Sequence, residues 1–253
     1  MAGARRGILA WLGRRPILQS WALITPAGIW LLLFFLVPIL LMLGYSVMPR
    51  GTYGGVESGF TLEHYVRFFD PLYLTILGRT VLVALCCTGL CLVLGYPVAW
   101  VIARSGRWRN LLLFLVVLPF WTSFLVRTFA MIFLLRDTGL VNTLLLRLGL
   151  VDQPVTLLYT PFAVIAGLVY VHLPFMLLPL YTNLEKHDPV LLDAAQDLGA
   201  NAWARFWRVT FPLSLPGIFS GSALVFIPVL GMFAVPELLG GTGDLLIGNL
   251  IKE

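Results

Sequence analysis

Five apolar stretches, each long enough to cross a lipid bilayer, constrain this chain of 253 residues more than any other feature of its sequence. A helix needs about 20 predominantly apolar residues to span the hydrocarbon layer. Such stretches run over residues 21–47, 74–103, 111–135, 160–181 and 213–235. Only 11% of the residues are charged, whereas a soluble domain carries roughly 25%. We therefore expect an all-α, polytopic membrane helical bundle with five spans.

Basic residues are divided unevenly between the two sides of these spans. Lys and Arg accumulate in the cytoplasmic connections of membrane proteins. A cytoplasmic N-terminus places ten of them inside, which are Arg5, Arg6, Arg14, Arg15, Arg104, Arg107, Arg109, Lys186, Arg205 and Arg208. It places five outside, which are Arg50, Arg67, Arg136, Arg147 and Lys252. We therefore expect a basic cytoplasmic tail over residues 1–20 and a transmembrane domain over residues 21–253. The first span is too long for a cleaved signal peptide.

The sequence lacks the residue patterns of an enzyme, a metal site or a nucleotide site. Its lysines, Lys186 and Lys252, do not follow the glycine pattern of a phosphate-binding loop, so ATP-driven transport would need a separate ATPase. Cys86, Cys87 and Cys91 lie within the second span, and the histidines are widely spaced. We expect no catalytic residue, metal or cofactor in this chain. The net charge of +5 does not indicate nucleic acid, because the basic residues cluster at the ends of the apolar stretches.

The connection at residues 182–212 carries the clearest helix start and stop signals of the chain. Asp188 is a typical helix N-cap, and the proline after it suits the first helical position. Gly199 suits the end of that helix, since glycine adopts a left-handed conformation at little cost. Asn201 can cap a second helix, which we expect Pro212 to break before the fifth span. The sequence thus predicts a cytoplasmic helix–turn–helix over residues 182–212, bent at the glycine, which we call the foot.

Small and acidic residues recur in the foot at a fixed spacing. The run Asp193-Ala194-Ala195 is followed by Gly199 and, after nine more residues, by a Val-x-Phe-Pro sequence. This pattern resembles the EAA motif of ABC-importer permeases, with an aspartate in place of the usual glutamate. The resemblance implies that the foot docks on an ATPase through Asp193, Ala194, Ala195, Asp197, Gly199, Val209 and Pro212. A merely solvated loop would explain the charges but not the spacing of glycine and proline.

A further set of residues is a candidate lining for a path through the membrane. Its members are Trp121, Phe124, Arg127, Tyr170, Glu237 and Asp244. A charge at a helix centre costs at least ~2.5 kcal/mol, so Arg127 either lines the path or extends to the outer surface. Aromatic faces suit a cation, and acids at the outer mouth would attract one. An unpaired arginine in the path would instead favour an anion.

Beyond the foot, the chain is similar to the spermidine/putrescine permeases of the first-subunit type. The matching stretches lie at residues 94–100, 118–122, 165–170, 173–176, 240–241 and 246–251. Permeases for iron, phosphonates and opines share much of this pattern, so one of these solutes is the alternative substrate. An ATP-independent channel or carrier is the alternative from another class.

The resemblance implies a type I ABC-importer permease in the bacterial inner membrane that moves a polyamine without chemical change. It also implies two ATPase subunits that bind ATP and Mg²⁺, a second homologous permease, and a periplasmic or lipid-anchored substrate-binding protein, all working in contact with membrane lipid. Such permeases have six core helices. We therefore expect a sixth span to be missing at the C-terminal end of this sequence.

Overall fold

The computed structural model describes residues 16–49, 51, 55, 57, 59–241 and 246–252, which form helices and connections without any strand. Within these residues, the segments long and apolar enough to cross a membrane are Ile24–Ser46, Pro71–Arg104, Phe124–Arg147, Pro161–Leu184 and Ala202–Leu230. The all-α class and the five spans are thereby confirmed. The chain divides into two compact units, Met1–Tyr73 and Leu74–Glu253.

The first unit contains a membrane-length helix without a buried face. Its elements are α2 (Pro16–Leu31), a π-helical turn (Leu32–Leu36), α3 (Val37–Ser46) and α4 (Glu63–Phe68). No residue of the most apolar window of the span is buried, as expected of a helix that is apolar on all sides and meets lipid or another protein. The π-helical turn directly precedes Val37-Pro38, where a wider turn accommodates the missing N–H and the bulky ring of the proline.

The second unit contains most of α5 and all later helices. In chain order these are α5 (Pro71–Arg104), a 3-10 turn (Gly106–Trp108), α6 (Arg109–Val117), a 3-10 turn (Leu118–Trp121), α7 (Phe124–Leu135), α8 (Leu140–Arg147), α9 (Pro161–Leu184), α10 (Pro189–Asp197), α11 (Ala202–Arg205), a π-helical turn (Phe206–Thr210), α12 (Phe211–Leu230), α13 (Ala234–Leu239) and α14 (Ile247–Lys252).

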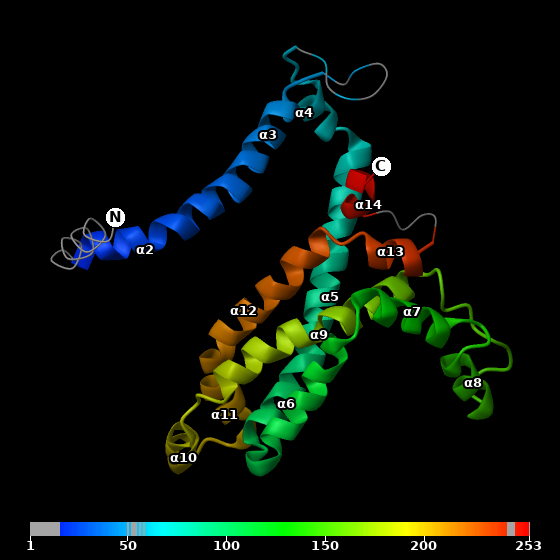
Figure 1. The fold of residues 1–253 in the computed structure, drawn as a ribbon. Helices are drawn as coiled ribbons and strands as arrows, with labels where there is room; N and C mark the ends of the chain where they lie inside the picture. The colour runs from blue at the N-terminus through cyan, green and yellow to red at the C-terminus, as the bar shows by residue number, and fades with distance from the viewer. Residues whose placement is uncertain are drawn as a thin grey trace, which may run out of the picture. The chain divides into compact units, whose positions relative to one another are not determined.

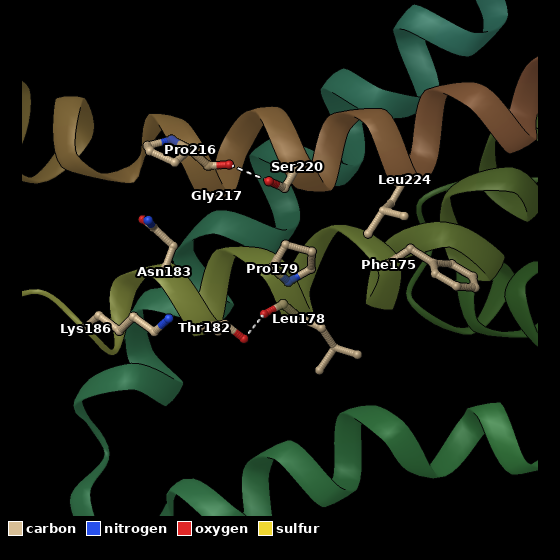
Figure 2. Close-up of a pocket in the computed structure, with 10 residues that line it drawn as sticks. All are labelled: Phe175, Leu178, Pro179, Thr182, Asn183, Lys186, Pro216, Gly217, Ser220 and Leu224. Atoms are coloured by element: carbon tan, nitrogen blue, oxygen red, sulfur yellow. Dashed lines mark hydrogen bonds between the residues drawn. The ribbon is translucent and has the colours of Figure 1, made fainter. Parts of the chain in front are cut away.

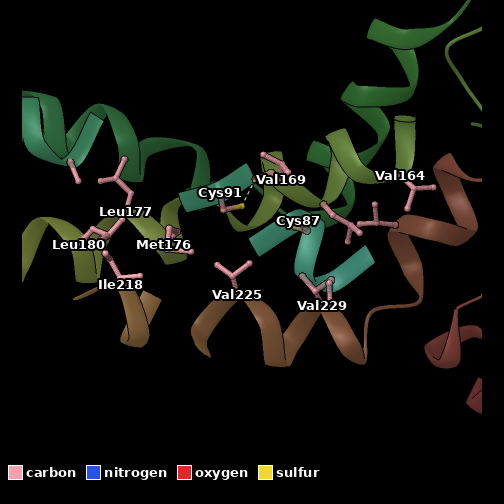
Figure 3. Packing of buried hydrophobic residues seen from close by; sticks show 14 of the residues in the cluster. Cys87, Cys91, Val164, Val169, Met176, Leu177, Leu180, Ile218, Val225 and Val229 are labelled. Carbon is pink, nitrogen blue, oxygen red and sulfur yellow. Dashed lines mark hydrogen bonds between the residues drawn. The ribbon is translucent and has the colours of Figure 1, made fainter. Parts of the chain in front are cut away.

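Helix α9 forms the centre of this unit. In its most apolar window 61% of the residues are buried, against 22% for α5 and 33% for the span that contains α12. Buried residues of α9 pack against buried residues of α5 and α12 (Figure 3). Those labelled in the figure are Val164, Val169, Met176, Leu177 and Leu180 of α9, Cys87 and Cys91 of α5, and Ile218, Val225 and Val229 of α12. The position of α9 between its neighbours explains why it has no polar face.

Two glycines allow α12 to lie close against α9. A Cβ atom built on Gly217 would lie 2.7 Å from the Cβ atom of Asn183, and one built on Gly221 would lie 3.0 Å from the carbonyl oxygen of Met176. Gly217 and Gly221 are four residues apart and so share one helix face, the small-x-x-x-small arrangement of closely packed membrane helices. The glycines therefore set the distance between the two helices that lead to the foot.

The third predicted span, residues 111–135, is not one helix. Thr122 and Ser123 are extended, with ψ angles of 146° and 141°, and they separate the 3-10 turn after α6 from α7. Pro119 stands at the start of that 3-10 turn, and both the N–H and the hydroxyl of Thr122 donate to its carbonyl oxygen, at 3.2 and 2.6 Å. This local hydrogen bonding replaces the helical pattern, and the chain changes direction at the break (Figure 1).

The fifth span also differs from the predicted residues 213–235, because Pro212 does not break the helix. The π-helical turn Phe206–Thr210 joins α11 to α12, and its wide turn accommodates the proline in the first turn of α12. The span therefore begins within the foot, at Ala202, and ends at Leu230. Gly231 caps α12, and the residues predicted to complete the span, 231–235, form a short connection and the start of the separate helix α13.

Candidate functional site

The first arm of the foot is the helix that the sequence predicts. Helix α10 begins after Asp188, whose side-chain Oδ1 accepts a hydrogen bond from the N–H of Val190 at 3.0 Å, and Pro189 occupies its first position. The first N–H groups of a helix have no partner within the helix. Asp188 accepts a hydrogen bond from one of them, and Pro189 has no N–H to leave unpaired. The predicted cap is therefore confirmed.

The bend of the foot lies at Gly199, as predicted. Its φ angle of +81° is left-handed, and no heavy atom lies within 4 Å of a Cβ built at this position. The N–H of Gly199 donates to the carbonyl of Gln196 at 2.8 Å, and the N–H of Ala200 donates to that of Ala195 at 3.0 Å. These two bonds form a Schellman motif, which ends a helix through a left-handed residue. Glycine is needed here for its backbone conformation and not for space.

The second arm folds back on the first through polar contacts. Asn201 caps α11, its Oδ1 accepting from the N–H of Ala204 at 2.8 Å. Arg205 Nη1 donates to Gln196 Oε1 at 2.6 Å and ties α11 to α10. The second arm continues without interruption through the π-helical turn into α12, so the foot and a membrane-spanning helix form one continuous element.

A pocket of about 390 Å³ lies in the elbow between the arms. Its lining consists of Ala195, Leu198, Gly199, Ala200, Asn201, Ala204, Arg208 and Val209. Of the predicted coupling residues, the pocket brings together Ala195, Gly199 and Val209, which are far apart in the motif. The others, Asp193, Ala194, Asp197 and Pro212, are exposed outside this lining. No ion pair of Asp193 or Asp197 occurs in the described part of the chain.

The foot also exposes large apolar side chains that sequence reasoning missed. Leu198 is 89% exposed, Trp203 71% and Val190 65%, and no residue of α10 is buried. Exposed apolar residues around a small pocket are typical of a surface that another protein covers. The sequence did contain one sign of this apolar surface, which is Leu198 directly before Gly199, since a solvated loop does not require a leucine there.

Contacts with α5, α6 and α9 near the foot hold the foot to the bundle. Tyr96 of α5 packs edge-on against Phe206, with ring centroids 5.8 Å apart, and its hydroxyl lies 3.1 Å from Ser214 Oγ. Arg109 Nη1 pairs with Glu185 Oε1 at 2.5 Å across the start of α6 and the end of α9. The aromatic contact holds the π-helical turn against α5, and the hydroxyl contact holds the start of α12 against the same helix. The ion pair holds the other end of the foot, where it leaves α9.

The candidate path residues do not converge on one pocket. Trp121 is 76% exposed and stacks edge-on with Phe114 at 5.8 Å, whereas Phe124 is half-buried against the core. Tyr170 is 40% exposed on α9, and Arg127 is 8% exposed on α7. Glu237 is exposed on α13 rather than in a loop. Asp244 lies outside the described residues.

A larger pocket, of about 470 Å³, lies between α9 and α12 on the side toward the foot. Figure 2 shows its lining of Phe175, Leu178, Pro179, Thr182, Asn183, Lys186, Pro216, Gly217, Ser220 and Leu224. None of the predicted path residues lines it. The hydroxyls of Thr182 and Ser220 donate to carbonyls of their own helices, at 2.9 and 2.7 Å, which leaves their lone pairs available to accept.

Comparisons with known proteins agree with these features. The family described as binding-protein-dependent transport system inner membrane components matches residues 92–253. The spermidine/putrescine transport system permease protein PotB of Salmonella typhimurium (strain SL1344) is 46% identical over 235 residues, which cover 92% of this chain and 82% of that protein. The chain belongs to this family of transport components. PotB of Escherichia coli (strain K12) is also 46% identical, over 91% of this chain and 84% of its own.

More distant relatives share the same class. The inner membrane ABC transporter permease protein YdcU of Escherichia coli (strain K12) is 34% identical, over 78% of this chain and 66% of its own. The crystal structure of a bacterial ABC transporter involved in the import of the acidic polysaccharide alginate matches with a TM-score of 0.65 and 22% identity, over 96% of this chain and 85% of that one. At this identity the match shows the fold alone, which is that of an ABC-importer permease.

Membership of the family assigns the general role. The chain is an inner-membrane permease subunit of an ABC transport system, and it is not an enzyme. Such a system includes an ATPase and a substrate-binding protein as its other parts.

Proposed function

We propose that this chain is the first permease subunit of an ATP-driven importer of spermidine or putrescine. The observation that carries the proposal is the 46% identity, over 92% of the chain, to a relative named as a spermidine/putrescine permease. The importer would contain a second homologous permease, two ATPase subunits that bind ATP and Mg²⁺, and a periplasmic or lipid-anchored binding protein. The N-terminus would be cytoplasmic, as the distribution of Lys and Arg favours.

The foot would be the contact with the ATPase. Supporting this role are the pocket in its elbow, the small side chain of Ala195 within it, and the exposed Leu198 beside it. A knob from the ATPase could enter the pocket, and basic residues could pair with Asp193 and Asp197. The continuous helix from Ala202 to Leu230 would carry the motion of the ATPase into the membrane.

The substrate class follows from chemistry as well as from the relatives. A polyamine is a flexible polycation with methylene spacers, which suits aromatic faces such as Trp121, Phe124 and Tyr170. Glu237 and Asp244 would raise its concentration at the outer mouth. The buried Arg127 favours the alternative, an anionic solute such as a phosphonate, if its guanidinium faces the path.

Uptake by the full complex in membrane vesicles tests the substrate. We expect ATP-dependent uptake of labelled spermidine and putrescine, with no competition by a phosphonate. Replacement Glu237→Gln is expected to raise the KM for spermidine severalfold, since one of the attracting charges is lost. Uptake of the anion alone, abolished by Arg127→Gln, would replace the polyamine proposal by its alternative.

A further inference from the structure

Arg127 is a buried cation on α7. Its side chain is 8% exposed, and no ion pair of this residue occurs among the residues that the structure describes. Its Nε is enclosed, and the described part of the chain offers it no hydrogen-bond acceptor. Arginine within a membrane span is costly, and such residues usually pair with another group and mark functional positions.

The contact that Arg127 makes is with an aromatic ring on the other side of the helix break. Its guanidinium carbon lies 5.0 Å from the ring centroid of Phe120, within the range of a cation–π interaction. Phe120 belongs to the 3-10 turn before Thr122, and Arg127 belongs to the first turn of α7 after it. The interaction therefore bridges the break in the third span and fixes the Phe120 ring.

The Phe120 ring in turn packs against α9. Its centroid lies 5.1 Å from that of Phe175, in an edge-on arrangement, and the His172 ring lies 6.1 Å from Phe175 on the same helix. His172 is itself held by a 2.9 Å hydrogen bond between Nδ1 and the carbonyl of Leu168. Phe175 is thus positioned by two rings, one of which depends on Arg127.

Phe175 forms one end of the pocket between α9 and α12. Figure 2 shows Phe175 and Leu224 at one end of this pocket and Lys186 at the other, next to the foot. Phe175 lies nine residues before the end of α9, which is about 14 Å along a helix axis, close to half the thickness of the hydrocarbon layer. The pocket therefore extends along α9 from Lys186, next to the foot, to Phe175, a distance close to half the thickness of the hydrocarbon layer.

We propose that Arg127 acts through the Phe120 ring to hold Phe175 at the far end of this pocket, so that the ring closes the pocket toward the membrane face opposite the foot. Arg127 is then a positioning residue and does not touch the transported molecule. The cation–π contact also shields its charge behind an aromatic ring, so a polyamine in the pocket would meet Phe175 rather than the guanidinium. The proposal rests on the role of the chain as an import permease and not on the identity of the substrate.

Side-specific labelling of a cysteine in the pocket tests this arrangement. Ser220→Cys is introduced after Cys86, Cys87 and Cys91 have been replaced by alanine, and the full complex is treated with a membrane-impermeant thiol reagent in right-side-out and in inverted vesicles. With Arg127 present, we expect labelling from the foot side and protection from the opposite side. Arg127→Gln is expected to raise the labelling rate from the opposite side about tenfold, since a desolvated cation–π contact is lost.

Matched variants separate positioning from general structural damage. Arg127→Lys keeps a cation and should restore protection, whereas Phe120→Leu keeps an apolar side chain and should reproduce the effect of Arg127→Gln. Arg147→Gln, on the exposed surface of α8, should change nothing. Co-purification of the other subunits with Arg127→Gln is checked first. If this variant does not assemble, the labelling of Phe120→Leu alone tests the proposal.

The proposal is overturned by unchanged protection in Arg127→Gln or in Phe120→Leu, or by a cysteine at position 220 that is not labelled from the foot side. The labelling needs no substrate. Failure of spermidine uptake with an intact pattern of protection would therefore refute the polyamine proposal and leave this one standing.

Discussion

Replacement of Gly221 by leucine is expected to destabilise the second unit strongly, because the added side chain would force α9 and α12 apart. A Cβ at this position would lie 2.8 Å from the Sδ of Met176 and 3.0 and 3.3 Å from its carbonyl oxygen and Cα. The sulfur could move aside, but the backbone of α9 could not without separating the two helices. Overpacking typically costs about 1–3 kcal/mol, and the contact with the backbone of α9 places this variant at the upper end of that range. This is a large part of the roughly 5–15 kcal/mol that stabilises a typical domain.

The measurement is the melting temperature of the purified chain in detergent. A loss of about 3 kcal/mol corresponds to a decrease of roughly 10 °C for a chain of this size. Gly89→Leu is the matched control, because no heavy atom lies within 4 Å of a Cβ built on Gly89. If both variants melt like the unmodified chain, the close approach of α9 and α12 at Gly221 is wrong.

Replacement of Gly199 by valine is expected to disconnect the permease from its ATPase while leaving the membrane bundle folded. The left-handed φ of +81° costs an ordinary residue roughly 1–2 kcal/mol, and a β-branched residue suffers most. Relief of this strain would break the two hydrogen bonds of the Schellman motif and reorient the second arm. Because each ~1.4 kcal/mol is a factor of ten in an equilibrium constant, we expect co-purification with the ATPase and stimulated ATP hydrolysis to fall about tenfold.

Gly199→Asn distinguishes backbone strain from other causes. Asparagine tolerates the left-handed conformation, and there is open space for its side chain at this position. We expect this variant to keep most of the coupled hydrolysis. An equal loss in both variants would mean that the position matters for a reason other than its backbone conformation.

Sequence reasoning predicted the features that depend on local rules. The five spans followed from length and apolar composition, and the foot followed from Asp188, Gly199 and Asn201, whose preferences act within a few residues. The resemblance of the foot and of further stretches to ABC-importer permeases indicated the family, which the comparisons confirm. These features need no knowledge of how distant segments meet.

The features that were missed depend on backbone geometry beyond one turn or on tertiary contact. Two prolines in apolar stretches have different effects. The helix breaks after Pro119, at Thr122, but continues past Pro212 by way of a π-helical turn. Composition does not decide between these two outcomes. The contacts from Arg127 through Phe120 to Phe175 join α7, the 3-10 turn before it and α9. Residue spacing in the sequence cannot predict contacts between separate elements. The grouping of Ala195 with Val209 in one pocket required the bend to be in place.

Cross-linking from position 198 tests the central claim, that the foot is where this permease meets its ATPase. Leu198→Cys in a chain without other cysteines places a thiol on the most exposed large apolar residue of the foot. We predict that a short bifunctional thiol–amine reagent joins this position to the ATPase subunit in the assembled complex, and that ATP changes the yield. Leu150→Cys, 67% exposed in the connection after α8, serves as the control and should give no such product. Absence of an ATPase cross-link from position 198, or an equal yield from position 150, would contradict the account.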